Sequence, residues 1–187
     1  MNMHDGIIAD RYAKAFLEYT DAHGKSQAVA DQVSVVLSAM GRLPKFRDSV
    51  TGEYVLEFEE RLSLLRSALA PAVIEESLVN LYSLMNRNGR LEQFRMTLLD
   101  YLVLYRKENN IRVVMITSAS GDEKITEMAG MMAEKEFGQD VVSLQRVDPD
   151  LVGGFIIDSW GYRLDASVRG ALEKMDKGLK EKNKRKV

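Results

Sequence analysis

Apolar residues recur at helical spacing along the first part of the chain, up to about residue 110. The pattern predicts a first helix that starts after Asp5, a good N-cap residue, and runs to about Asp21. Its apolar positions cover roughly 200° of the helix circumference, about twice the arc that packing on one core requires. These positions are Ile8, Ala9, Tyr12, Ala13, Ala15, Phe16, Leu17 and Tyr19. We therefore expect this helix to contact a second surface besides its own core.

Further helical segments follow in the same part of the chain. They are predicted at residues 26–41, 55–69, 72–88 and 90–108, with a short segment at 43–50. Val55 is the first apolar residue of the stripe in the segment 55–69. Pro71 ends that segment because proline cannot continue a helix. Ile74 belongs to the apolar stripe of the segment 72–88. The segment at 90–108 is apolar nearly all round, which is typical of a helix at the centre of a bundle or at a domain junction.

The spacing of apolar residues along the chain changes after Asn110. Residues 111–120 are β-branched and alternate in polarity, which predicts a strand. A helix at 122–137, strands at 140–147, 152–158 and 162–164, and a final helix at 167–182 complete the pattern. The fold class is therefore mostly α: a helical bundle over residues 1–108, followed by a small α/β module over residues 109–187.

Composition narrows the functional classes. The chain has 187 residues, a net charge of −2 and no cysteine, which excludes disulfides, a thiolate nucleophile and a zinc–thiolate site. The first residues have no basic start followed by an apolar core, so they do not read as a secretory signal. No apolar run approaches the roughly 20 residues that span a bilayer. We expect a soluble protein that can still dock on a membrane complex.

Two glycine motifs suggest phosphate binding at first sight. Gly24-Lys25-Ser26 resembles the end of a P-loop, but the position that needs the first glycine holds Tyr19, and a helix leads in. Ser26 fits better as an N-cap. The pair Gly153-Gly154 lacks the dinucleotide-binding spacing and precedes a strand, so a bulge or a close backbone approach is the favoured interpretation.

Acidic and histidine side chains give no convincing catalytic or metal site. Asp148 and Asp150 flank Pro149 and could serve acid–base chemistry or bind a cation, although turn formation is favoured. His4 and His23 have no partner at metal-ligand spacing. We expect neither a catalytic residue nor a cofactor.

Two further patterns leave alternatives open. The basic end, residues 180–187, could bind nucleic acid or acidic lipid, or could be a solvated terminus. Met128, Met131 and Met132 could form a pliable binding surface, although a place in the core is favoured.

Four motifs together resemble a known family. RYAKAFLEY (11–19), NGRLEQF (88–94), ITSAS (116–120) and VDPDLVGGFIIDSWGYRLDASVRGALEKM (147–175) are similar to the delta subunit of F-type ATP synthases, called the oligomycin sensitivity-conferring protein in mitochondria. The similarity runs from about residue 7 to residue 180. Two positions depart from the family pattern: Ala166 stands where glycine is usual, and Trp160 is unusual in its hairpin.

The resemblance implies a non-catalytic stator subunit without a cofactor. It implies a six-helix amino-terminal bundle that receives an amino-terminal helix of the alpha subunit, and a carboxyl-terminal module that binds the end of the peripheral b-subunit stalk. The alpha helix would lie between the first and fifth helices. By position this nominates Tyr12, Ala15, Phe16, Tyr19, Leu81, Leu84 and Met85.

The resemblance also gives the carboxyl-terminal motif a structural role. We expect Asp148, Gly153, Gly154, Asp165 and Ser167 to shape turns, a bend and a helix cap.

The expected location is the cytoplasmic face of a bacterial plasma membrane, where the protein would be held through the complex. A helical adaptor that binds nucleic acid through its basic end is the alternative function.

Overall fold

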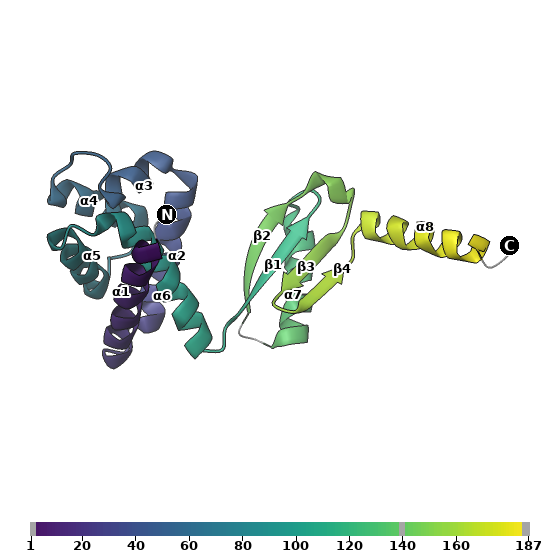
Figure 1. Cartoon of the computed structure of the whole chain (residues 1–187), viewed down its shortest axis with the longest axis horizontal. Helices are drawn as coiled ribbons and strands as arrows, with labels where there is room; N and C mark the ends of the chain where they lie inside the picture. The colour runs from purple at the N-terminus through teal and green to yellow at the C-terminus, as the bar shows by residue number, and fades with distance from the viewer. Residues whose placement is uncertain (1–2, 139–140, 185–187) are drawn as a thin grey trace. The chain divides into compact units, whose positions relative to one another are not determined.

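The computed structural model describes residues 3–138 and 141–184, and the chain divides into two compact units, Met1–Asn109 and Asn110–Val187 (Figure 1). The amino-terminal unit is helical. Its elements are α1 (Met3–Ala22), α2 (Ser26–Arg42), α3 (Pro44–Thr51), α4 (Phe58–Leu69), α5 (Glu76–Arg87), the short 3₁₀ helix η1 (Leu91–Gln93) and α6 (Phe94–Glu108). The long helix α6 packs against both α1 and α2.

Large side chains of α6 lie at the centre of this bundle. Phe94, Leu98 and Tyr101 are fully buried, and the rings of Tyr101 and Phe16 lie 4.9 Å apart. The Tyr101 hydroxyl donates to the carbonyl of Ser26 over 3.0 Å, so its burial leaves no unpaired polar group. Val103 is exposed, and α6 is therefore central on most of its surface without being enclosed all round.

Several helix starts differ from the sequence prediction. Asp5 lies inside α1, which already includes Met3, and Ser26 is the first residue of α2 after the N-cap Lys25. Val55 is fully exposed and precedes α4, because Glu57 and Glu60 form a reciprocal capping box that starts the helix at Phe58. Apolar periodicity alone therefore extended the predicted helix beyond its cap.

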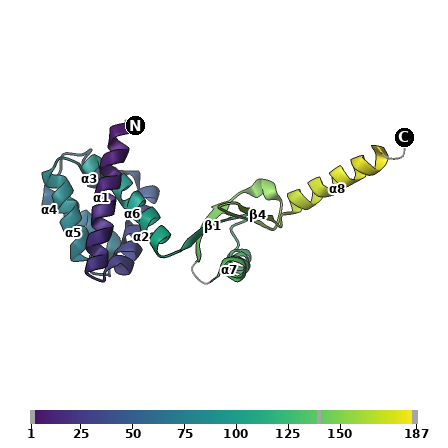
Figure 2. The ribbon, with the colours of Figure 1, turned by 60° about the horizontal axis from the view of Figure 1, so that its bottom comes forward.

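The carboxyl-terminal unit is a small mixed sheet with one helix packed on it. Its elements are β1 (Arg112–Ser118), α7 (Glu123–Phe137), β2 (Val141–Val147), the 3₁₀ helix η2 (Pro149–Leu151), β3 (Phe155–Ser159), β4 (Tyr162–Asp165) and α8 (Val168–Lys184). The strand order is β2-β1-β3-β4, with β1 parallel to β2 and antiparallel to β3, and β3 antiparallel to β4. The turned view shows α7 along one face of the sheet (Figure 2). A mostly helical chain with a small sheet towards its end is thus confirmed.

Alanines, not methionines, join α7 to the sheet. Ala129 and Ala133 are buried against Val114, Ile116, Phe155 and Ile157. Met128, Met131 and Met132 point outward and are 47%, 63% and 42% exposed, so the favoured place in the core was wrong for them. The small side chains let the helix approach the strands closely, which leaves the long ones on the outer face.

Candidate functional site

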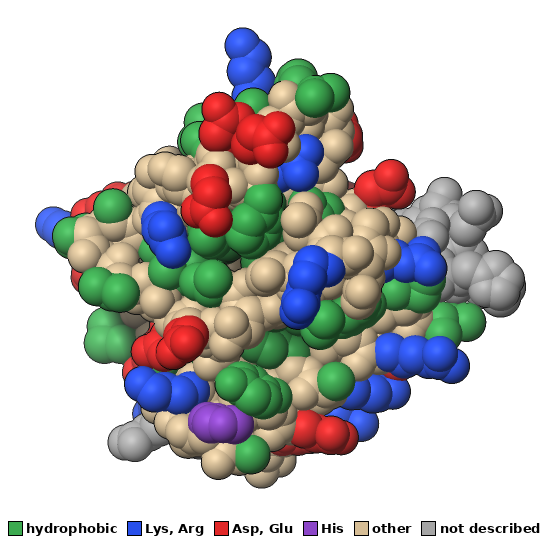
Figure 3. Space-filling view, turned by 90° about the vertical axis from the view of Figure 1, so that its left-hand side faces the viewer, with side chains coloured by type: hydrophobic (Ala, Val, Ile, Leu, Met, Phe, Trp, Pro, Cys, Tyr) green, Lys and Arg blue, Asp and Glu red, His purple; other side chains and the backbone are tan. Residues whose placement is uncertain are grey.

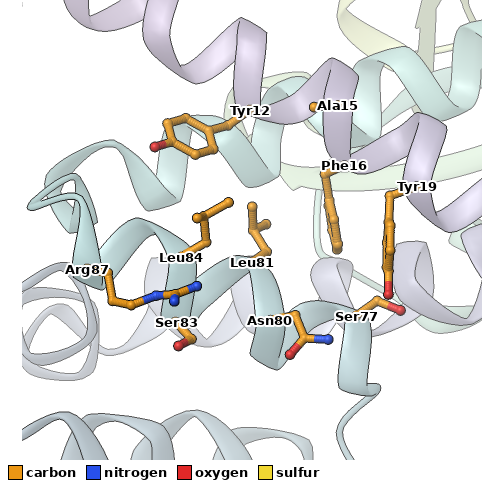
Figure 4. Close-up of a pocket in the computed structure, with 10 residues that line it drawn as sticks. All are labelled: Tyr12, Ala15, Phe16, Tyr19, Ser77, Asn80, Leu81, Ser83, Leu84 and Arg87. Carbon is orange, nitrogen blue, oxygen red and sulfur yellow. The ribbon is translucent and has the colours of Figure 1, made fainter.

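An open groove runs between α1 and α5 in the amino-terminal unit. The pocket between the two helices has a volume of about 420 Å³. The side chains around it are Tyr12, Ala15, Phe16, Tyr19, Ser77, Asn80, Leu81, Ser83, Leu84 and Arg87 (Figure 4). The four from α1 recur at i, i+3, i+4 and i+7, which is one face of a helix. A single face of α1 therefore forms one wall.

The wide apolar arc of α1 serves two surfaces. Ala9, Ala13 and Leu17 are buried in the bundle, whereas Ala15 is exposed and Tyr19 is 44% exposed. The Tyr12 hydroxyl accepts a 2.9 Å hydrogen bond from the side-chain amide of Asn88, which holds the Tyr12 ring beside α5. Because the side chain of Ala15 is small, the α1 wall projects least at its middle, between the rings of Tyr12 and Tyr19 (Figure 4).

The α5 wall combines apolar and polar side chains. Leu81 is buried, and Leu84 is 41% exposed. Ser77, Asn80 and Arg87 add hydroxyl, amide and guanidinium groups to the lining. Figure 3, which views this side of the molecule, shows hydrophobic side chains in a hollowed area with charged side chains around it.

The structure brings six of the seven nominated residues together around this pocket. The exception is Met85, which is fully buried and does not line it. Met85 follows Leu84 directly, and one residue turns the side chain by about 100° around the helix, away from the groove. Sequence reasoning missed Ser77, Asn80, Ser83 and Arg87 because it searched only for apolar stripes. Ser77 and Arg87 lie four residues before Leu81 and three after Leu84, so helical spacing alone could have placed them.

The glycine pair lies in a tight backbone crossing before β3. Gly154 has a left-handed φ of 74°, and a Cβ added there would lie 2.2 Å from the carbonyl oxygen of Ala166. The amide of Val168 donates to the carbonyl of Gly153 over 3.0 Å. The backbone is thus packed against backbone where a phosphate loop would need free space.

Asp148 makes a turn upstream of this crossing. Its carboxylate accepts from the amide of Asp150 over 3.1 Å at the start of η2, and it lies 3.9 Å from Arg169. The turn chemistry expected around Pro149 therefore occupies the Asp148 carboxylate.

Asp165 and Ser167 form the start of α8. The Asp165 carboxylate accepts from the Ser167 hydroxyl at 2.6 Å and from its amide at 3.0 Å, and the Ser167 hydroxyl oxygen accepts from the amide of Gly170. The two bonds from Ser167 lower the pKa of Asp165 below its ordinary value. A Cβ at Gly170 would lie 2.7 Å from that carboxylate, so a larger residue there would have to displace the Asp165 side chain. Ala166 is not among the non-glycine residues with positive φ, so the departure from glycine brings no backbone strain.

The described part of the chain offers little for metal or membrane chemistry. No group of three His, Asp or Glu side chains there is arranged to hold a metal ion, and no helix there is long and apolar enough to cross a membrane. The side chains of the basic end, residues 180–187, lie outside the described residues, as does that of His4.

The chain combines a helical bundle that carries an open, largely apolar groove with a small α/β unit. The family model for the ATP synthase delta (OSCP) subunit matches residues 8–179, and the chain belongs to that family. The family expected from the four motifs is thereby confirmed.

Individual relatives agree over nearly the whole length. ATP synthase subunit delta of Phocaeicola vulgatus is 32% identical over 185 residues, covering 98% of this chain and 99% of that protein. ATP synthase subunit delta of a Synechococcus strain is 32% identical over 174 residues, covering 92% and 94%. A chain in the cryo-EM structure of the Toxoplasma gondii mitochondrial ATP synthase hexamer shares the fold, with a TM-score of 0.64, 16% identity and coverage of 96% and 98%. The family is a non-catalytic, peripheral subunit of the membrane-bound ATP synthase.

Proposed function

We propose that this chain is the stator link of an F-type ATP synthase. Its amino-terminal six-helix bundle receives the amino-terminal helix of an alpha subunit on top of the catalytic head. Its carboxyl-terminal unit binds the end of the b-subunit stalk. The link keeps the head from turning with the rotor during proton-driven ATP synthesis. The observation that carries the proposal is the open groove between α1 and α5, lined by Tyr12, Ala15 and Leu84.

The groove suits a helix better than a small molecule. Its α1 wall follows the helical repeat, and the low point at Ala15 allows a second backbone to come close, while Tyr12 and Tyr19 offer ring surface on either side. A linker under torque needs contacts that last much longer than one turnover. A nanomolar interface corresponds to about 12 kcal/mol, and its durability depends mainly on slow dissociation.

An exposed apolar stripe on α8 supports the stalk-binding role of the second unit. Val168, Leu172 and Met175 are 43%, 57% and 65% exposed and recur at helical spacing. Nothing in the described residues of that unit covers them fully. A helix with one open apolar side is suited to pack along a helical stalk.

The location follows from the complex. The two sequence relatives named above, from Phocaeicola vulgatus and a Synechococcus strain, are bacterial proteins, which supports a place at the cytoplasmic face of a bacterial plasma membrane. The protein would be held there by its partners.

The experiment is calorimetric titration of the intact chain with a synthetic peptide of the alpha-subunit amino terminus. Ala15→Asp and Leu84→Asp should abolish binding, because each places a charge against an apolar partner surface. Leu64→Asp on α4 is the matched control, since Leu64 is 37% exposed and lies outside the groove. Circular dichroism should show all three variants folded. Unchanged peptide affinity in Ala15→Asp and Leu84→Asp would reject the groove as the alpha site.

A further inference from the structure

We propose that the groove selects a helix carrying a carboxylate near one end, and that Arg87 pairs with that carboxylate and fixes the direction in which the helix lies. The inference rests on the proposed function, because it takes the occupant to be an alpha-subunit helix. It adds the chemistry by which the groove recognises that helix and orients it.

Arg87 is the charged member of the groove lining. The other described residues around the pocket are apolar, aromatic, hydroxyl or amide side chains. Arg87 ends α5, so its charge lies at one end of the groove, beside Leu84 (Figure 4). Tyr19 and Ser77 lie towards the opposite end and carry no charge. The lining is therefore electrically asymmetric along its length.

The Arg87 guanidinium has no acidic partner among the described residues. The ion pairs among the described residues of the amino-terminal unit are Lys14–Asp10, Lys25–Glu75 and Arg47–Asp48, and none of them includes Arg87. A guanidinium presents several N–H donors in a planar fork that matches a carboxylate. An Asp or Glu on the occupant is the group that would satisfy it.

The asymmetry gives the occupant one preferred direction. With its acidic end beside Arg87, the helix gains an ion pair and keeps its apolar face on Leu81, Leu84 and the tyrosines. In the reverse direction the same acid would face the uncharged end near Tyr19, and Arg87 would be covered without a partner. Charge pairs at the rim of an interface mainly set specificity and association rate.

The size of the effect follows from what partly exposed ion pairs contribute. Removing the charge should weaken binding roughly 2- to 5-fold, as expected for loss of an exposed pair. Reversing it adds repulsion of similar size, so the loss should reach roughly 10-fold. Added salt should weaken wild-type binding and should affect the uncharged variant less.

The test is a double-mutant cycle on the intact chain. Arg87→Gln and Arg87→Glu are titrated with the alpha amino-terminal peptide and with peptides in which each Asp or Glu is replaced singly by Asn or Gln. Arg95→Glu is the matched control, since Arg95 is an exposed arginine of α6 outside the groove. We expect one acidic position of the peptide, near one end of its apolar stripe, to lose its effect when Arg87 is changed.

The outcomes separate this inference from the function on which it rests. If wild type binds the peptide but Arg87→Glu binds as tightly as Arg95→Glu, the role of Arg87 is wrong while the groove stands. Strict additivity between Arg87 and every acidic position overturns the inference in the same way. If the peptide does not bind wild type at all, the proposed alpha site itself fails.

Discussion

Replacing Gly154 by alanine should destabilise the carboxyl-terminal unit far more than the same change at the adjacent glycine. Gly154 has a φ of 74°, and an L-residue with a side chain pays a conformational cost of about 1–2 kcal/mol in this left-handed region. The added Cβ would lie 2.2 Å from the Ala166 carbonyl oxygen, and relief to an ordinary 3.4 Å contact requires the two backbone segments to separate. That movement stretches the Ala166–Phe155 and Val168–Gly153 hydrogen bonds, both 3.0 Å long and each contributing about 1 kcal/mol. The expected loss is about 3–4 kcal/mol.

Gly153→Ala is the matched control for this prediction. Gly153 does not have a left-handed φ, and its added Cβ would meet the end of the Val168 side chain at 3.1 Å. Because that side chain can move by a few tenths of an ångström, the cost should stay below about 1 kcal/mol.

Urea unfolding followed by circular dichroism measures both variants. Trp160 is a poor fluorescence probe here because it is 97% exposed in the folded chain. Hydrogen exchange should show faster exchange at Ala166 and Val168 in Gly154→Ala than in Gly153→Ala. Equal stabilities of the two variants would refute the argument that backbone crowding requires the second glycine.

Three further predictions test other parts of the structure. Met131→Gln should change the free energy of unfolding by less than about 0.5 kcal/mol, whereas Ala129→Leu should cost about 1–3 kcal/mol by overpacking, both measured by urea unfolding. Burial raises the pKa of Tyr101 to about 12, so its stabilising effect should be lost as pH rises from about 10 to 12, and Tyr101→Phe should weaken this loss. The pKa of Asp165 is lowered in the fold, so its carboxylate should stabilise the fold at neutral pH, and Asp165→Asn should be less stable there. In acid unfolding the difference should begin to shrink below the ordinary pKa and vanish once the pH has fallen through the lowered pKa of the folded chain.

The sequence was most informative where periodicity and packing gave the same answer. The apolar arc of α1 was too wide for one core, and the structure leaves Ala15 and Tyr19 open beside α5. The glycine pair, followed by strand residues, indicated a close backbone approach, and the Gly154–Ala166 crossing is one. Each conclusion depended on a local geometric requirement that few other residues can meet.

Other features could not be predicted because they depend on which side of a helix meets its neighbour. In α7 the stripes of Ala129 and Met131 were both apolar, and only the close approach of helix to sheet decides that the alanines face inward. Arg87 was missed for a different reason: the search followed apolar stripes alone, although Arg87 lies three residues after Leu84 and helical spacing could have placed it on the same face. The start of α4 was extended to Val55 because that residue follows the helical period, although the capping box at Glu57 begins the helix later.

The most direct measurement of the central claim is the affinity of this chain for a purified catalytic head with and without the alpha amino-terminal segment. We predict tight binding to the complete head and loss of binding when that segment is removed, with Ala15→Asp reproducing the loss on the complete head. Equal affinity for the two heads would contradict the account.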